Sequence, residues 1–401
     1  MLSAVSKPNP CWMLSCHPYP NMSIFPPGST IGILGGGQLA RMLCMEAKRM
    51  GYRTLVWTGG LEAPAMALCD EVIEQPFDDP KAIVHFVSQA DVATAEFENI
   101  PRSTLEAVAA GVPLHPSPDA IATCANREQE KTFLRKQQIP CAPFWIVTNA
   151  EELKHAMRAL AGPGVLKTSA FGYDGKGQLK IQGNENPEDI WQQFQAPRAI
   201  LEGFISFKTE LSVMIARNGN GEIRCFDPVE NFHRHHMLDM TIAPAAIADA
   251  VRSRAIEIAT RIANAFQYVG IMGVEFFLNH DDSLLVNEMA PRPHNSGHHT
   301  IDACETSQFE QQLRAVCGLP LGSTALLCPA VMLNLLGDMW PAIDQSPDWS
   351  MLLSDPSAAL HLYGKKRAIE RRKMGHATFL GSNALQRAKS LKENLLASGR
   401  P

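Results

Sequence analysis

Hydrophobic positions in the first quarter of the chain fall into short apolar runs that alternate with amphipathic stretches of helical period. The predicted strands are Ile31–Leu34, Arg53–Trp57 and Asp91–Ala95, and the predicted helices are Gln38–Met50 and Lys81–Gln89. Alternation of this kind is typical of a parallel, doubly wound α/β sheet with helices on both faces. Residues 30–118 are therefore expected to form a doubly wound N-terminal domain.

The pattern becomes mixed after Asp119, where strands and helices follow one another less regularly. Helices are predicted at Asp119–Ala125, Arg127–Gln138, Ala150–Leu160, after Pro187 and at Ala245–Phe266. Strands are predicted at Ala142–Val147, Val165–Lys167, Gln178–Ile181, Ala199–Glu202, Met272–Leu278, Leu284–Asn287, Val331–Leu336 and Ala359–Tyr363. We expect an α+β domain over 119–318 and a small C-terminal domain over 319–401. Residues 1–21 show no periodicity, so 1–29 is expected to be a disordered N-terminal extension.

Composition narrows the class of protein. A net charge of −5 argues against a general nucleic-acid binder, which needs a basic face. No apolar run approaches the roughly 18 residues that cross a bilayer, and the proline-rich start does not resemble a signal peptide. The ten cysteines include no Cys-x-x-Cys pair, so they are expected to be reduced thiols of a cytoplasmic protein.

A glycine-rich turn follows the first predicted strand. Gly35, Gly37 and Ala40 match the dinucleotide fingerprint, in which glycines let phosphate approach the start of a helix. The acidic residue that would hold a ribose is absent after Trp57, which disfavours NAD. Binding of another phosphate or polar ligand, and a purely structural turn, both remain open.

A second glycine-rich turn is more specific. Lys167 ends an apolar strand, and the turn Gly172–Gly177 carries Tyr173, Asp174 and Lys176. Backbone amides of such a turn can cover a triphosphate while the two lysines neutralise its charge, and no Walker motif is present. A solvated hairpin loop is the alternative.

Carboxylates stand at the ends of later strands. Glu202 ends a strand where an adenine edge could be read, and Glu210 could hold a ribose or lie on the surface. Glu275 and Glu288 interrupt apolar strands, which is costly unless they are paired or bind a metal. Oxygen ligands on neighbouring strands suit magnesium, with a buried salt bridge as the alternative.

The loop after Glu288 carries further polar groups. Arg292, Asn295 and Ser296 could together clamp an anion beside the metal. The cluster His233-Arg-His-His236 could suggest zinc, but it has no further spaced ligand. We therefore favour one nucleotide contact from this cluster.

Four of these motifs together resemble a known family. GILGGGQLARM, FGYDGKGQ, GVEFF and NEMAPRPHNSGHHT are similar to the 5-(carboxyamino)imidazole ribonucleotide synthetases of the ATP-grasp superfamily, in order from Thr30 to Gly381. The resemblance implies a Rossmann-like pre-ATP-grasp domain, a central ATP-grasp domain and a small C-terminal domain. It also implies a homodimer that uses ATP, Mg²⁺ and bicarbonate to form carboxyphosphate and carboxylate the 5-amino group of 5-aminoimidazole ribonucleotide in purine biosynthesis.

The resemblance carries residue roles over to matching positions. The implied ATP contacts are Arg127, Lys167, Gly172, Tyr173, Asp174, Gly175, Lys176, Gly177, Gln178, Glu202, Gly203, Phe204, Ile205, Glu210, His233, Asn287 and Glu288. Glu275 and Glu288 would hold magnesium. The ribonucleotide contacts would be Gln38, Leu39, Glu96, Asn295, Ser296, Lys365 and Arg372, and the catalytic residues Tyr173, Asp174, Lys176 and Arg292.

The chain departs from the family's usual sequence at two positions, and three other functions are alternatives. Lys176 stands where the family commonly has arginine, which replaces a bidentate contact by a point charge, and Ala40 stands where it has glycine. Other ATP-grasp ligases, such as biotin carboxylase or formate-dependent glycinamide ribonucleotide transformylase, lack the HNSGH motif. A nucleotide sensor would not need both metal carboxylates, and a dehydrogenase lacks its acidic residue.

Overall fold

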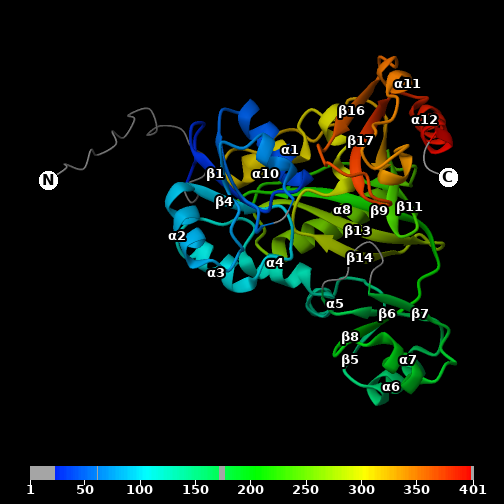
Figure 1. Cartoon of the computed structure of the whole chain (residues 1–401). Coiled ribbons are helices and arrows are strands. Elements are labelled where there is room, and N and C mark those ends of the chain that lie inside the picture. Colours follow the sequence, from blue (N-terminus) through cyan, green and yellow to red (C-terminus); the bar gives the residue numbers. More distant parts are fainter. Residues whose placement is uncertain (1–22, 61, 171–176, 399–401) are drawn as a thin grey trace.

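The computed structural model describes residues 23–60, 62–170 and 177–398 of the 401-residue chain. Three sheets organise this part of the chain: a parallel sheet of four strands, an antiparallel sheet of four strands, and an antiparallel sheet of nine strands. Figure 1 shows the first sheet with its helices in blue and cyan, the smaller antiparallel sheet in green at the bottom, and the large sheet between them and the C-terminal elements.

The N-terminal sheet has the order β3-β2-β1-β4, with all neighbours parallel. Its strands are β1 (Thr30–Leu34), β2 (Arg53–Trp57), β3 (Glu71–Ile73) and β4 (Val92–Ala95), and its helices are α1 (Gln38–Arg49), η2 (Pro64–Ala67), α2 (Pro80–Gln89) and α3 (Arg102–Ala109). Helix α1 packs on one face of the sheet, and α2 and α3 pack on the other. The predicted doubly wound parallel sheet is confirmed, with β3 and α3 added to the predicted elements.

The segment just before β1 is packed rather than detached. The amide of Phe25 donates to the carbonyl of Cys317 at 3.0 Å, and the hydroxyl of Tyr52 donates to the carbonyl of Phe25 at 2.8 Å. The expected disorder of 1–29 therefore does not extend to residues 23–29, because these bonds tie them to the connection between α1 and β2 and to the residue that follows α10 (Gln308–Val316). Residues 1–22 lie outside the described part of the chain.

The small antiparallel sheet has the order β5-β8-β6-β7. It consists of β5 (Phe144–Val147), β6 (Gly164–Thr168), β7 (Gln178–Ile181) and β8 (Ala199–Gly203), covered by α6 (Ala150–Leu160) and α7 (Pro187–Phe194). Both helices begin at an asparagine cap: Asn149 accepts from the amide of Glu152, and Asn186 from that of Glu188, each at 2.9 Å. Helices α4 (Pro118–Ala125) and α5 (Arg127–Lys136) connect this unit to the N-terminal sheet.

The large sheet runs β14-β13-β9-β11-β12-β15-β17-β16, with β10 beside β9. Its strands are β9 (Phe207–Arg217), β10 (Ile223–Cys225), β11 (Val229–Arg234), β12 (Met237–Ala243), β13 (Gly270–Asn279), β14 (Leu284–Ala290), β15 (Ala330–Leu336), β16 (Ala358–Leu362) and β17 (Lys373–Leu380). Helix α8 (Asp249–Ala265) packs on it through Ile258 and Ile262. The helix predicted from Ala245 begins at Asp249, because residues 244–248 form a loop in which the amide of Ala245 bonds to Pro228.

The C-terminal residues extend this same sheet. Strand β12 pairs antiparallel with β15, and Met240 stands opposite Leu333. The cluster around Leu333 also includes α11 (Ser350–Leu353) and α12 (Ala384–Ser398). The remaining short elements are η3 (Asn295–Gly297), α9 (Thr300–Ala303) and η4 (Gly337–Met339). The third unit expected after Gly318 therefore shares the sheet of the second unit. Within the described residues, no helix has the length and apolar character to cross a membrane.

Candidate active site

A cavity of about 1000 Å³ opens where the three sheets meet. It brings together predicted residues of the N-terminal and central domains: Gln38, Leu39, Glu96, Arg127, Lys167, Gln178, Glu202, Gly203, Phe204, Ile205, Glu210, His233, Glu275, Asn287, Glu288, Arg292 and Asn295. Gly177, Ser296, Lys365 and Arg372 do not line it. The predicted Gly172, Tyr173, Asp174, Gly175 and Lys176 lie outside the described residues.

Buried lysines hold one wall of the cavity in place. Lys167 on β6 donates to one carboxylate oxygen of Glu202 on β8 at 2.9 Å, and the Lys131 ammonium lies 3.8 Å from the same oxygen. Burial opposes ionisation of Glu202, but the two lysines outweigh it and hold its pKa below the usual value. The other oxygen of Glu202 is buried without a partner among the described residues, so it is available to a ligand.

The sequence analysis missed Lys131, which is only 1% exposed. Its ammonium also donates to the carbonyl of Asn287 at 2.8 Å, which links α5 to β14. Glu130 and Lys131 follow Arg127 by three and four positions and so share one helix face with it, and three charged groups of α5 line the cavity. That spacing was the signal in the sequence, but their partners lie on strands far along the chain.

Two carboxylates face each other on neighbouring strands of the large sheet. Glu275 on β13 pairs in register with Glu288 on β14. Burial, reinforced by the charge of Glu288, raises the pKa of Glu275 to about 7. A cation between them would relieve this repulsion, and oxygen-only ligands suit Mg²⁺. Among the described residues no group of three or more His, Cys, Asp or Glu side chains could hold a metal, so phosphate oxygens would have to complete the coordination.

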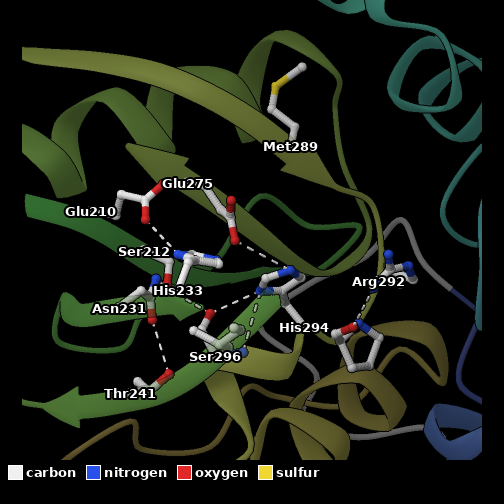
Figure 2. Close-up of polar contacts among 12 residues, drawn as sticks. Glu210, Ser212, Asn231, His233, Thr241, Glu275, Met289, Arg292, His294 and Ser296 are labelled. Atoms are coloured by element: carbon white, nitrogen blue, oxygen red, sulfur yellow. Dashed lines mark hydrogen bonds and ion pairs between the residues drawn. The ribbon is translucent and has the colours of Figure 1, made fainter. Parts of the chain in front are cut away.

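The predicted nucleotide histidine already has a carboxylate partner. Nδ1 of His233 on β11 lies 2.5 Å from a carboxylate oxygen of Glu210 on β9, as Figure 2 shows. Burial would lower the pKa of His233, but its hydrogen bond and ion pair with Glu210 outweigh burial and raise it. His235 and His236 turn the chain from β11 into β12 with positive φ angles of 51° and 65°.

A polar network supports the loop after β14. The Ser212 hydroxyl donates to the Ser296 hydroxyl at 2.7 Å and accepts from the side-chain nitrogen of Asn231 at 3.0 Å (Figure 2). The side-chain oxygen of Asn231 in turn accepts from the Thr241 hydroxyl at 3.0 Å. Nδ1 of His294 lies 2.9 Å from the Ser296 hydroxyl. Ser296 is fully buried, so the structure places it beneath the cavity wall, where it orients His294.

Asn295, the neighbour of Ser296, does face the cavity. Its side-chain oxygen and nitrogen are both buried and have no hydrogen-bond partner among the described residues. A buried amide that makes no hydrogen bond costs free energy, so such a group is expected to meet a ligand or ordered water.

The first glycine-rich turn has a protein carboxylate at the helix start. Glu96 at the end of β4 accepts from the amides of Gly37 at 2.7 Å and Ala40 at 3.2 Å. A Cβ at Gly37 would stand 2.7 Å from that carboxylate, which explains the glycine. These two amides at the start of α1 are therefore already bound by a protein carboxylate, which favours the structural turn over a phosphate at these two amides. Burial raises the pKa of Glu96 above its usual value.

The three cations expected on the substrate's phosphate all have protein partners. Arg292 forms a bidentate pair with Glu98 at 2.7 and 2.9 Å, and Arg372 is paired with Glu62. Lys365 donates to the carbonyl of Lys373 at 2.8 Å. Burial, together with the charges of Arg372 and Lys373, lowers the pKa of Lys365 to about 8. Lys373 lines the cavity and was not predicted, although it belongs to the same basic run.

Comparison with known proteins defines the class. Residues 132–309 match the ATP-grasp domain, 29–125 the ribonucleotide synthetase preATP-grasp domain, and 330–390 the phosphoribosylaminoimidazole carboxylase C-terminal domain. A nucleotide-sized cavity between the two antiparallel sheets, lined by strand-end lysine and carboxylates, agrees with these matches. The molecule is an ATP-grasp ligase.

Relatives narrow the class to one family. The N5-carboxyaminoimidazole ribonucleotide synthase of Bacillus subtilis is 43% identical over 354 residues, which cover 88% of this chain and 92% of the relative. The ADP complex of the Staphylococcus aureus synthetase superposes with a TM-score of 0.85 at 34% identity, covering 94% of this chain and 99% of that one. The Aspergillus clavatus synthase, in complex with ADP and 5-aminoimidazole ribonucleotide, has a TM-score of 0.81 at 31% identity, covering 93% and 98%. The chain belongs to the N5-carboxyaminoimidazole ribonucleotide synthase family, as its motifs indicated.

The buried carboxyl of Glu130 makes stability depend on pH. Burial raises its pKa to about 8, although Lys131 opposes this, while its carboxylate accepts from the amide of Met289 at 2.6 Å. A carboxyl whose pKa is higher in the folded state stabilises at low pH, and this contribution is lost as pH rises from the unfolded value toward about 8. Glu130→Gln keeps an acceptor for the amide of Met289 but does not titrate. The free energy of unfolding of the variant, relative to that of the wild type, should therefore increase as the pH rises through this window.

Urea unfolding at about pH 5.5, 7 and 8.5 would measure this difference. Glu128→Gln is the matched control on the same helix, because the hydrogen bond from Arg198 lowers the pKa of Glu128 and places its titration below this window. A difference between Glu130→Gln and the wild type that stays constant with pH would contradict the prediction.

Proposed function

We propose that this enzyme carboxylates the 5-amino group of 5-aminoimidazole ribonucleotide, using ATP and bicarbonate, to give N5-carboxyaminoimidazole ribonucleotide, ADP and phosphate. The observation that carries the proposal is one cavity in which the Glu275–Glu288 pair and the Lys167–Glu202 pair face Asn295 and the start of α1. A phosphoryl-transfer site and an amine site that share one cavity are what a short-lived intermediate requires.

The reaction needs two transfers in sequence. An oxygen of bicarbonate attacks the γ-phosphorus of ATP, the bond to the β-phosphate oxygen breaks, and carboxyphosphate and ADP result. The substrate's amine nitrogen then forms a bond to the carboxyl carbon, directly or after release of CO₂, while phosphate leaves and the amine loses a proton. Phosphoryl transfer depends mainly on positioning and charge neutralisation.

ATP would lie between the small sheet and the large sheet. Lys167 and Arg127 would neutralise its phosphates together with residues 172–178 of the glycine-rich turn. Glu202 with the following Gly203, Phe204 and Ile205 would contact adenine, and Glu210 with His233 would hold the ribose. Two observations support these roles. One carboxylate oxygen of Glu202 has no partner among the described residues, and His233, whose pKa is raised, lines the cavity with its polar ring.

Glu275 and Glu288 would hold Mg²⁺, with Asn287 beside them at the phosphates. Bound there, the ion would neutralise charge on the transferring phosphoryl group. The mutual repulsion of the two carboxylates supports this assignment. The pairing of β13 with β14 continues on both sides of a bulge at Asn287, and it holds the two carboxylates opposite each other.

The amine substrate would lie at the N-terminal end of the cavity. Gln38, Leu39, Glu96 and Asn295 would surround it, and Ser296 would act through the loop that it supports. Lys365, Arg372 and Arg292 would meet its phosphate, which must compete with Glu62 and Glu98 for the two arginines. Tyr173 and Asp174 would lie where the two substrates meet, with Lys176 as a further catalytic residue. A homodimer in the cytoplasm completes the proposal, on the strength of the family resemblance.

Release of ADP with 5-aminoimidazole ribonucleotide and bicarbonate, each omitted in turn, tests the function. Incorporation of ¹³C from labelled bicarbonate into an acid-labile carbamate should accompany it. Glycinamide ribonucleotide with formate, and biotin with bicarbonate, are the control substrates. Turnover of either control substrate without turnover of the aminoimidazole would overturn the proposal.

Removal of one metal carboxylate should separate binding from chemistry. Glu288→Gln should lower turnover by on the order of a hundredfold or more, because stabilisation of the transferring phosphoryl group is lost, while the nucleotide still binds weakly. Steady-state ADP release and nucleotide titration by calorimetry would measure the two effects. Normal turnover in both Glu288→Gln and Glu275→Gln would exclude the magnesium assignment.

Loss of Arg372 should affect one substrate only. Charge-assisted hydrogen bonds contribute about 1.5–3 kcal/mol, so Arg372→Ala should raise the Michaelis constant for the aminoimidazole ribonucleotide about tenfold to a hundredfold. The constant for ATP should remain nearly unchanged. Arg371→Ala removes the neighbouring exposed cation and serves as the control. Equal rises in both Michaelis constants would indicate general damage to the fold. If neither constant rises, Arg372 does not bind the substrate and belongs to a solvated basic surface.

A further inference from the structure

His298 is a buried histidine whose role in the reaction is so far unassigned. It follows η3, is 1% exposed, and lines the cavity. Behind it lie the rings of Phe309, Tyr363 and His376, with centroids 5.7, 6.3 and 4.8 Å from its own. Phe309 and Tyr363 belong to the same apolar cluster as Leu39 at the start of α1, so His298 faces the end of the cavity proposed for the amine substrate.

Gln308 determines which ring nitrogen of His298 carries the proton. The amide oxygen of Gln308 accepts from the backbone amide of His294 at 2.8 Å, and its nitrogen donates to the carbonyl of His294 at 2.8 Å. These two bonds fix the orientation of the side-chain amide. If it were reversed, its nitrogen would face the backbone N–H of His294 and its oxygen would face the carbonyl of His294, and both hydrogen bonds would be lost. The same Gln308 nitrogen lies 3.0 Å from Nδ1 of His298. Nδ1 must therefore accept, and the proton resides on Nε2.

This arrangement is rigid. Gln308 is fully buried, and its backbone amide donates to the hydroxyl of Thr300 at 2.9 Å. A Cβ at Gly297 would stand 2.6 Å from the Gln308 side-chain oxygen, so glycine is required for this close approach. Burial lowers the pKa of His298 well below its usual value, and His361, Lys373, His299 and Arg292 add to the effect. The ring therefore presents a neutral N–H.

We propose that Nε2–H of His298 is a fixed, neutral hydrogen-bond donor to an uncharged acceptor of the amine substrate, a ribose oxygen or the unsubstituted ring nitrogen. Gln308 is the positioning residue that sets its tautomer. A neutral donor suits an uncharged acceptor, whereas the substrate's phosphate requires the cations. The identity of the substrate rests on the proposed function, but the tautomer and its placement do not.

Two variants distinguish the roles of the two ring nitrogens of His298. His298→Asn keeps a carbonyl acceptor near Nδ1 for Gln308 and has no group at the Nε2 position. His298→Gln can place an N–H near Nε2 and loses the acceptor for Gln308. His298→Asn should raise the Michaelis constant for the aminoimidazole ribonucleotide about tenfold to a hundredfold, because a buried substrate acceptor is left unpaired. The constant for ATP should stay within about twofold, and His298→Gln should recover part of the loss.

Inhibition by ribose 5-phosphate locates the acceptor. A weaker inhibition constant in His298→Asn assigns the bond to the ribose, and an unchanged constant assigns it to the ring nitrogen, provided that the substrate's Michaelis constant rises. In the wild type, ¹⁵N imidazole shifts should show the Nε2–H tautomer of His298 unchanged from about pH 6 to 8.5, with the signal identified by its absence in His298→Asn.

Three results would overturn the inference: an unchanged constant for the amine substrate in His298→Asn, equal rises for amine and ATP, or an Nδ1–H tautomer in the wild type. Failure of the wild type to turn over the aminoimidazole would instead overturn the proposed function, and the tautomer measurement would still stand.

Discussion

The structure depends on the pairing of charges that it buries where its three sheets meet. Lys131 is the clearest case, because a fully buried ammonium is tolerated only with good partners. It has the carbonyl of Asn287 at 2.8 Å and shares Glu202 with Lys167. These partners lie on β14 and β8, in the two antiparallel sheets, so one side chain of α5 connects the walls of the cavity.

The same constraint explains why the substrate-facing groups are already occupied. Glu96 takes two amides of α1, Glu98 takes Arg292, and Glu62 takes Arg372. Each pair keeps a buried or half-buried charge compensated and also fixes its direction. A substrate anion then exchanges one partner for another instead of ordering a free side chain. Asn295 and the second oxygen of Glu202 are the exceptions, which marks them as positions where a ligand completes the hydrogen bonding.

Local patterns in the sequence singled out charged residues within or at the end of apolar strands, and the structure places four of them at the cavity, because a strand and the side chains that it carries are encoded together. Lys167, Glu202, Glu275 and Glu288 were all found in this way. Strand β9 was missed, since its first half is polar and its place is set by pairing with β13 some 60 positions later. Lys131 and His298 were missed for the same reason: their roles come from partners that only the tertiary fold brings near.

The C-terminal segment contributes to the wall of the cavity. Residues 319–401 were expected to form a small C-terminal domain, and 330–390 match such a domain; its strand β15 continues the large sheet from β12, and β17 and β16 follow. This continuity delivers Tyr363 and Lys373 to the cavity wall and sets His376 behind His298. The His376 ring on β17 lies tilted against the His298 ring, with 4.8 Å between the centroids, and the shared sheet fixes this contact. Since the proposed donor face of His298 depends on that backing, the C-terminal strands take part in building the proposed amine site as directly as the strands that carry Glu275 and Glu288.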